Sequence, residues 1–327
     1  MPHSTTTNIL ITGAGGFIGQ ALATALLQSD PNITTITLTD VIEPQPPKIQ
    51  TSTKITSVKA DLTNKAACES LLNSNLTHVY LLHGLMSGAA EANLDLGLRV
   101  NIDSTRLILD ILRKTIPGVR VIFPSSLAVF GPSGSTTVTE STMPQPGSSY
   151  GAEKQICEIM LNDFSRRGLI DGRIVRLPTI IVRPGAPSGA ASSFCSGIIR
   201  EPLKGEVSQL PVARDLELWV SSTRTIIKNL IIAKDLPEEK FKNRPSRVVN
   251  LPGITVTVEQ MLAALKEVGG QEALDLVEEK RDRNVEKIVG NWPSRFDISL
   301  AKELGFVDDG PLDRTLREYI EDYGGSK

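Results

Sequence analysis

Residues 12–19 read Thr-Gly-Ala-Gly-Gly-Phe-Ile-Gly, and this stretch decides the fold. It follows an apolar run and opens a helical pattern near Ile18–Gln28. Gly13 permits a tight turn, Gly16 permits close approach of the backbone to a pyrophosphate, and Gly19 permits tight packing of helix on strand. The free N–H groups at the start of the helix would then hold the phosphates. The stretch therefore predicts a dinucleotide-binding turn.

Short apolar runs alternate with helical patterns on both sides of this turn. Parallel strands buried on both faces have such continuous apolar sequences, and helices connect them. The alternation predicts an α/β fold with a Rossmann-type, doubly wound parallel sheet. The expected strands are Asn8–Thr12, Thr34–Thr39, Thr53–Lys59, Val79–His83, Arg120–Pro124 and Arg173–Leu177, and the further expected helices are Lys65–Leu72, Gly97–Lys114 and Tyr150–Arg167.

The alternation fades after Pro178. The segment Arg183–Ser193 is rich in Gly, Ala, Pro and Ser, which is typical of a functional loop. We therefore expect a Rossmann domain over residues 1–180 and a smaller, α-rich substrate-binding region over residues 181–327, partly interleaved with the sheet. In this second region the patterns predict helices near Val258–Glu267, Glu272–Arg283 and Pro311–Tyr323 and a short strand near Arg247–Leu251.

The composition excludes several classes of protein. The chain has 327 residues, and its 35 basic and 37 acidic side chains nearly cancel, so no global positive field exists to bind nucleic acid or an anionic membrane. The few cysteines and histidines are too scattered for a disulfide framework or a metal centre. No segment has the pattern of a signal peptide or a membrane span, so we expect a cytoplasmic protein. The cysteines and histidines are Cys68, Cys157, Cys195, His3, His78 and His83.

A carboxylate follows the glycine turn at a distance typical of dinucleotide-binding units. Asp40 ends the second expected strand, about twenty residues after the last glycine of the turn. A carboxylate at this place hydrogen-bonds a ribose 2′-hydroxyl and repels a 2′-phosphate. The turn and the carboxylate together predict NAD, rather than NADP, as the cofactor.

Three further residues have the chemistry of proton transfer. Tyr150 and Lys154 are four residues apart, so they lie on one face of the expected helix. A nearby ammonium favours the phenolate and so would lower the pKa of the tyrosine toward a usable range. Ser126 ends the fifth expected strand, and the carboxyl ends of parallel strands face the ligand crevice. We interpret the tyrosine as acid/base and the serine as a hydrogen-bond partner of the reacting oxygen.

Together, Thr12–Gly19, Asp40, Asp61-Leu62, Ser125–Gly131 and Tyr150–Lys154 resemble the extended short-chain dehydrogenases/reductases in order and spacing. This family includes nucleotide-sugar epimerases and dehydratases. The resemblance implies that Tyr150 is the catalytic acid/base, that Lys154 holds the nicotinamide ribose and tunes the tyrosine, and that Ser126 orients the substrate. It also implies a set of further cofactor contacts. These are Gly13, Gly16, Phe17, Ile18, Gly19, Asp40, Asp61, Leu62, Leu82, His83, Asn101, Tyr150, Lys154 and Pro178.

The sequence departs from the nucleotide-sugar enzymes near the expected substrate site. The run Arg176–Thr179 stands where those enzymes have Arg-Tyr-Phe-Asn, and Leu127-Ala128 replaces the acidic pair of the dehydratases. Several segments instead resemble the D-erythronate dehydrogenase subgroup, which oxidises a small sugar acid at a secondary hydroxyl. A guanidinium can grip the carboxylate of such a substrate bidentately. The candidate substrate contacts are Ser87, Ser126, Tyr150, Thr179, Arg183 and Arg224, and Glu91 also falls in the same expected loop as Ser87.

Alternatives remain open at this point. A sugar epimerase would use the same tyrosine with a tightly held NAD, and a redox-sensing regulator would keep the fold without catalysis. Each arginine could also form a structural ion pair. The expected helices Gly97–Lys114 and Tyr150–Arg167 carry apolar faces, which the resemblance assigns to a homodimer interface, although both could simply pack on the sheet.

Overall fold

The computed structural model describes residues 6–132, 136–185 and 189–324. Its centre is a seven-stranded sheet of strand order β10-β6-β5-β4-β1-β2-β3, in which every neighbouring pair is parallel. The order reverses beside β1, as in a doubly wound Rossmann sheet, so the predicted fold class is confirmed. The strands are β1 (Thr7–Thr12), β2 (Ile33–Asp40), β3 (Lys54–Lys59), β4 (His78–Leu81), β5 (Arg120–Ser126), β6 (Asp171–Leu177) and β10 (Val248–Asn250).

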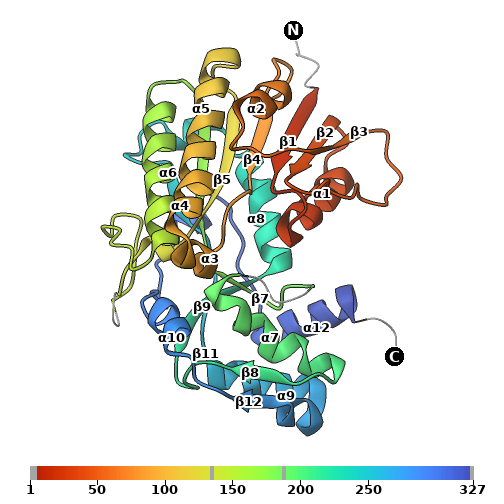
Figure 1. The fold of residues 1–327 in the computed structure, drawn as a ribbon, viewed down its shortest axis with the longest axis vertical. Helices are drawn as coiled ribbons and strands as arrows, with labels where there is room; N and C mark the ends of the chain where they lie inside the picture. Colours follow the sequence, from red (N-terminus) through yellow and green to blue (C-terminus); the bar gives the residue numbers. More distant parts are fainter. Residues whose placement is uncertain (1–5, 133–135, 186–188, 325–327) are drawn as a thin grey trace.

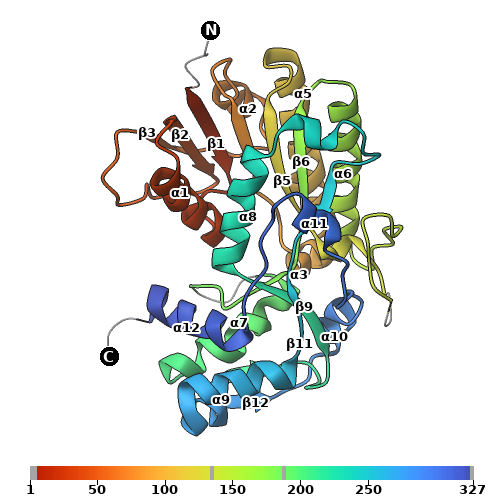
Figure 2. The same ribbon diagram turned by 180° about the vertical axis from the view of Figure 1, so that it is seen from behind.

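Helices cover both faces of the sheet (Figures 1 and 2). Each face has its own apolar cluster, because successive side chains of a strand point to opposite sides: Ile122 belongs to one cluster and Phe123 to the other. One layer contains α1 (Phe17–Ser29), α8 (Thr223–Asp235) and α11 (Ser299–Glu303). The other contains α2 (Lys65–Leu71), α5 (Ser104–Thr115) and α6 (Ser149–Arg166).

A second body of structure lies beyond the carboxyl ends of the strands (Figure 1). It has its own apolar cluster between helices and two small sheets of order β11-β9-β7 and β12-β8. The segment 181–327 also supplies β10, α8 and α11 to the central sheet and its layers. The elements of the second body are β7 (Thr179–Ile181), α7 (Phe194–Arg200), β8 (Ser208–Leu210), β9 (Glu217–Ser222), β11 (Ile254–Thr257), α9 (Val258–Asp275), β12 (Val277–Glu279), α10 (Arg283–Val289) and α12 (Leu312–Tyr323).

Two expected helices differ from the structure. The helix predicted over Glu272–Arg283 is wrong, because β12 occupies its centre and pairs with β8, about seventy residues earlier. The helix predicted from Gly97 begins as a π-helical segment, η1 (Leu98–Asp103), before α5. Two short helices precede η1, namely α3 (Ser87–Ala92) and α4 (Leu94–Gly97), and short 3₁₀ turns are η2 (Leu127–Val129), η3 (Ala191–Ser193), η4 (Pro202–Lys204) and η5 (Glu238–Phe241).

Across the described ranges, no helix has the length and apolar character needed to span a membrane. Residues 186–188 of the predicted loop lie outside the described residues.

Candidate active site

A cavity of about 860 Å³ lies at the carboxyl edge of the sheet, where the second body of structure faces it. The crevice outside the carboxyl ends of the strands is the usual ligand site of this architecture. Most of the residues singled out from the sequence line it. They are Gly13, Gly16, Phe17, Ile18, Gly19, Asp40, Asp61, Leu62, Leu82, His83, Ser87, Ser126, Tyr150, Lys154, Pro178, Thr179 and Arg183.

The glycine turn is shaped so that only glycine fits at two of its positions. Gly13 has φ +65°, and a Cβ there would lie 2.6 Å from the backbone nitrogen of His83. A Cβ on Gly19 would lie 2.6 Å from Cα of Ala14. Gly16 caps α1 without any side-chain hydrogen bond, so the N–H groups of the first helical turn remain available to an anion. The turn therefore fits a pyrophosphate.

The carboxylates of Asp40 and Asp61 line the cavity near the glycine turn. The Asp40 carboxylate accepts hydrogen bonds from the backbone nitrogens of Gly15, at 3.0 Å, and Val41, at 2.7 Å, and lines the cavity beside the turn. Hydrogen bonds from the backbone and side chain of Thr63 hold the pKa of Asp61 below its usual value. Backbone and side-chain donors therefore hold both carboxylates in place at the cavity.

Helix α6 carries Tyr150 and Lys154 into the cavity in its first turns. Ser148 caps the helix by accepting a hydrogen bond from Gly151. A Cβ on Gly151 would lie 2.0 Å from the carbonyl oxygen of Ala128, so this glycine allows α6 to pack directly on the segment that follows Ser126. The Lys154 ammonium donates to the carbonyl of Pro124 at 2.9 Å and lies 5.8 Å from the ring centroid of Tyr150.

The electrostatics of this pair differ from the prediction. Burial and the neighbouring Glu153 raise the pKa of Tyr150 above its ordinary value, and Arg183 is the group that lowers it. Burial also lowers the pKa of Lys154 to about 8. Desolvation disfavours both charged forms, and here it outweighs the attraction between ammonium and phenolate. The predicted lowering of the Tyr150 pKa toward a usable range by the ammonium of Lys154 is therefore not seen in this structure.

Ser126 and His83 have different kinds of partners. The Ser126 Oγ accepts a hydrogen bond from the backbone nitrogen of Ala128 at 3.1 Å, which leaves its O–H free to donate into the cavity. The ring nitrogens of His83 lie 2.8 Å from the hydroxyls of Thr12 and Ser104. Burial lowers the pKa of His83 to about 3, so its ring is neutral near pH 7 and shapes the cavity without a positive charge.

Asn101 lies outside the cavity lining and acts on a loop that forms it. Its side chain accepts a hydrogen bond from the backbone nitrogen of Leu85 at 2.6 Å and donates to the carbonyl of the same residue at 3.0 Å. It also donates to Glu153 of α6 at 2.5 Å. The geometry therefore does not support the predicted direct contact of Asn101 with the cofactor, because protein groups occupy its amide.

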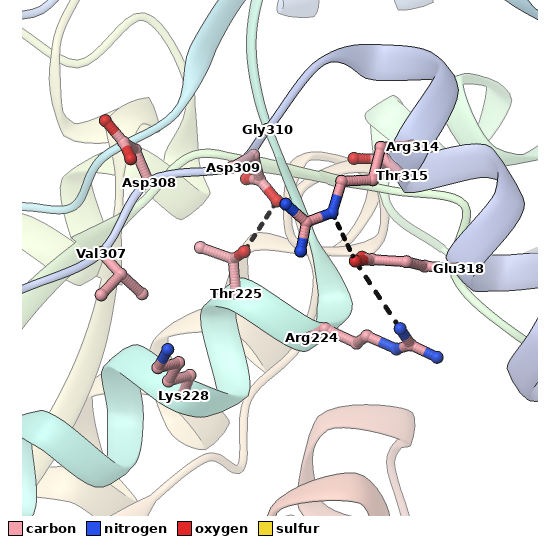
Figure 3. A pocket seen from close by; sticks show the side chains of 10 residues that line it. All are labelled: Arg224, Thr225, Lys228, Val307, Asp308, Asp309, Gly310, Arg314, Thr315 and Glu318. Carbon is pink, nitrogen blue, oxygen red and sulfur yellow. Dashed lines mark hydrogen bonds and ion pairs between the residues drawn. The ribbon is translucent and has the colours of Figure 1, made fainter.

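The two candidate arginines are placed very differently. Arg183 lies at the cavity, and its backbone nitrogen and Nε reach Ser196 Oγ at 3.0 and 3.3 Å. Its Nη2 is buried and has no hydrogen-bond partner among the described residues. Arg224 lies outside the cavity, on α8, where it lines a separate polar pocket (Figure 3).

The acids of α12 explain the position of Arg224. Its guanidinium pairs with Glu318, Glu321 and Asp322, and the hydrogen bonds to Asp322 are 2.6 and 2.7 Å long. Such pairs fasten α12 to α8. The prediction of Arg224 as a substrate contact is not supported, since these acids already neutralise it.

Comparison with known proteins places the chain in a family. The model of the NAD dependent epimerase/dehydratase family matches residues 9–224. The chain belongs to this family. D-erythronate dehydrogenases from Cupriavidus necator and Haemophilus influenzae are 43% and 41% identical to it. The first alignment covers 98% of this chain and 100% of the relative, and the second covers 96% and 98%.

A solved structure of the family has the same fold over nearly the whole chain. It is described as a nucleoside-diphosphate-sugar epimerase from Agrobacterium tumefaciens, with a TM-score of 0.90 and 35% identity, and the match covers 98% of this chain and 95% of the other. The L-threonine 3-dehydrogenase of Bos taurus is 25% identical over 97% of this chain and 82% of its own length. Named dehydrogenases and a named epimerase therefore share this architecture.

Several residues at the cavity were not predicted from the sequence. Trp292, Ser192 and Met86 line the cavity, and Glu153 holds Asn101. Trp292 follows α10, more than a hundred residues after Tyr150, and no local pattern points to the site. Glu153 stands directly before Lys154 and is 1% exposed, so an acidic residue on the buried face of that helix is the one signal that was visible.

Proposed function

We propose that this chain is an NAD-dependent dehydrogenase that oxidises a secondary hydroxyl of a small sugar acid such as D-erythronate to the keto acid. The observation that carries the proposal is Arg183, which lines the same cavity as Tyr150 and whose buried Nη2 has no hydrogen-bond partner among the described residues. A carboxylate is the ligand that such a group prefers. The two D-erythronate dehydrogenases that align over their full lengths support the same substrate class.

The side chains of the cavity have distinct tasks in this reaction. Tyr150 as phenolate takes the proton of the substrate hydroxyl, and Ser126 donates a hydrogen bond to the same oxygen. The positive charges of Lys154 and Arg183 favour this phenolate against burial, which raises the pKa of Tyr150. NAD, when bound, accepts the hydride from the carbinol carbon. The glycine turn and Asp61 hold the dinucleotide, and Asp40 favours NAD because a 2′-phosphate would meet a carboxylate.

The substitution Tyr150→Phe, which removes one oxygen atom, tests the proposal. With NAD and D-erythronate, Tyr150→Phe should abolish NADH formation, followed by absorbance, and leave NAD binding nearly unchanged. Erythritol, which lacks the carboxylate, is the matched substrate control and should react poorly with the wild type. Turnover of Tyr150→Phe within about tenfold of the wild type, less than a positioned acid/base contributes, would contradict the mechanism.

A sugar epimerase is the second candidate, because a solved family member of very similar fold is described as one. An epimerase returns the hydride to its substrate and keeps NAD bound. Purification without added cofactor separates the two. Bound NAD together with the absence of NADH release would favour the epimerase.

We also propose that the protein works in the cytoplasm as a homodimer. Ile156 and Ile159 of α6 and Leu98 of the adjoining η1 are 42%, 62% and 38% exposed. Leu109 and Leu112 of α5, by contrast, are buried in the cluster on the sheet. A large apolar side chain on an open helix face favours a partner helix. Three buried, unpaired cysteines are compatible with a reducing compartment.

A further inference from the structure

Helix α7 carries a buried positive charge that the proposed mechanism does not use. All seven residues from Phe194 to Arg200 are buried, and Arg200 itself is only 2% exposed. A buried ion is unfavourable unless it is paired and hydrogen-bonded. Arg200 is not one of the described residues that line the cavity, so its effect on the site must pass through its neighbours.

The partners of Arg200 are a carboxylate and a backbone carbonyl. Its Nε donates to Oε1 of Glu201 at 3.1 Å, and its Nη2 pairs with the same oxygen. Its Nη1 donates to the carbonyl oxygen of Arg183 at 2.8 Å. Glu201 thus pairs with the charge of Arg200, and the remaining hydrogen bond fastens the backbone at Arg183 to helix α7.

A second residue of α7 holds the other side of Arg183. The hydroxyl oxygen of Ser196 accepts hydrogen bonds from the backbone nitrogen and Nε of Arg183, at 3.0 and 3.3 Å. Ser196 and Arg200 are four residues apart, so they lie on one face of the helix. The N–H and C=O that they bind belong to the two peptide units on either side of the Arg183 Cα. Because each unit is planar, these bonds restrict both backbone dihedral angles of Arg183.

The backbone at this point depends on such support. Arg183 stands two residues after the end of β7, and the preceding Val182 has a left-handed φ of 51°. Backbone of this kind persists where the surrounding structure determines it. Helix α7 is a fixed support, because Ile198 and Ile199 pack with Val182 in the apolar cluster of the second body, where α7 lies beside β7 (Figure 1).

The charge of Arg200 also acts on Arg183. Burial and the positive charge of Arg200 lower the pKa of Arg183. Among the described residues, Glu201 is the one acid that pairs with either arginine. Two guanidinium groups and one carboxylate leave an excess of positive charge next to the cavity, which favours an anionic ligand group.

We propose that Ser196 and Arg200 are positioning residues, which hold Arg183 in the orientation that lets its Nη2 bind the carboxylate of the substrate. The proposal rests on the proposed dehydrogenase function. Arg200 contacts neither NAD nor the sugar acid in this assignment and acts through Arg183. The KM for the sugar acid, but not that for NAD, therefore depends on Arg200.

A double-mutant cycle tests whether Arg200 acts through Arg183. With NAD and D-erythronate, Arg200→Met should raise the KM for D-erythronate by about tenfold or more, because a misplaced binding group loses its contact. The KM for NAD should stay unchanged. In Arg183→Met, the same second substitution should change the KM by less than about twofold, since no guanidinium remains to be positioned. Equal changes in the two backgrounds would overturn the proposal.

Two further variants separate positioning from damage to the helix. Arg200→Lys can still donate to the carbonyl of Arg183 and should return the KM for D-erythronate to within about threefold of the wild type. Ile198→Val removes one buried methylene from the same helix, touches no hydrogen bond of Arg183 and should leave this KM unchanged. A rise in Ile198→Val as large as in Arg200→Met would contradict the positioning role.

A smaller substitution and a crystal structure complete the test. If Arg200→Met does not fold, Ser196→Ala removes the other support of Arg183 and should raise the same KM; an unchanged KM would overturn the proposal. Crystals of the folded variant should show the Arg183 side chain displaced from its place at the cavity. An undisplaced Arg183 would refute the positioning role. No NADH from the wild type and D-erythronate, with Arg183 displaced in the variant, would instead refute the proposed function and leave the positioning role standing.

Discussion

Two features that are unfavourable for folding coincide at Arg183. The preceding residue, Val182, has φ 51°, a left-handed backbone that a β-branched side chain rarely adopts. The Nη2 atom of Arg183 is also buried without a hydrogen-bond partner among the described residues, and a buried donor left unpaired destabilises a protein. Strain of this kind concentrates at ligand sites. The backbone turn at Val182 and the hydroxyl of Ser196 aim a positive charge at the cavity, where a carboxylate would satisfy it.

We predict that Arg183→Met raises the KM for D-erythronate by about 10- to 100-fold, the worth of a charge-assisted hydrogen bond. The KM for NAD should stay unchanged. Since the variant removes a buried donor atom that lacks a partner among the described residues, its free energy of unfolding should not fall. Arg224→Met is the matched control, because its exposed pairs with α12 contribute at most about 1 kcal/mol and lie outside the cavity. Steady-state kinetics that show equal KM changes in both variants would remove Arg183 from the substrate site.

At the scale of elements, local patterns predicted what is determined locally. The inner strands of the central sheet are apolar runs buried on both faces. The turn at Gly13 and the Tyr150–Lys154 pair depend on spacings of a few residues. Pairing across long distances was not visible. β12 is a strand only because β8 lies beside it, and Trp292 reaches the cavity only through the packing of the second body.

The same limit applied to single side chains on these elements. Arg183 and Arg224 were equal candidates in the sequence, and the acids of α12 decide between them. Asn101 was placed in the right region, but its amide holds Leu85 because η1 brings the two together. A side chain's partners follow from the tertiary fold, which residue spacing does not contain.

Helix α6 gives a prediction about assembly. Ile156 and Ile159 point away from the buried Cys157 and Leu161, and the described residues leave them 42% and 62% exposed. We predict that Ile159→Asp converts the protein from dimer to monomer in sedimentation velocity, because a charge in an apolar interface is strongly unfavourable. Met143→Asp is the control: Met143 is 76% exposed, belongs to the segment before α6 and should leave the dimer intact. A wild type that sediments as a monomer at all concentrations would refute the dimer.

The stability of the whole molecule should fall in mild acid. His78 lies in β4, between β1 and β5, and the ring of His83 contacts Thr12 of β1. Burial lowers the pKa of His78 to about 4 and that of His83 to about 3. Both bind a proton less readily when folded than when unfolded, where the pKa is about 6.5. The unfolded chain therefore gains protons first as the pH falls through 6.5, and each histidine removes about 2 kcal/mol of stability between pH 7 and pH 5.

The carboxylates do not mask the loss of stability that the histidines cause between pH 7 and pH 5. Asp30 and Asp171 have lowered pKa values, so their contribution is lost only below the ordinary carboxyl range. Glu153, whose pKa is raised by burial, acts in the opposite direction but equally in wild type and variant. In urea unfolding at pH 7 and pH 5, His78→Gln should therefore lose about 2 kcal/mol less than the wild type. An equal loss in both proteins would mean that His78 is protonated in the folded state, and that the Arg120 and Lys234 charges near it do not keep its ring neutral.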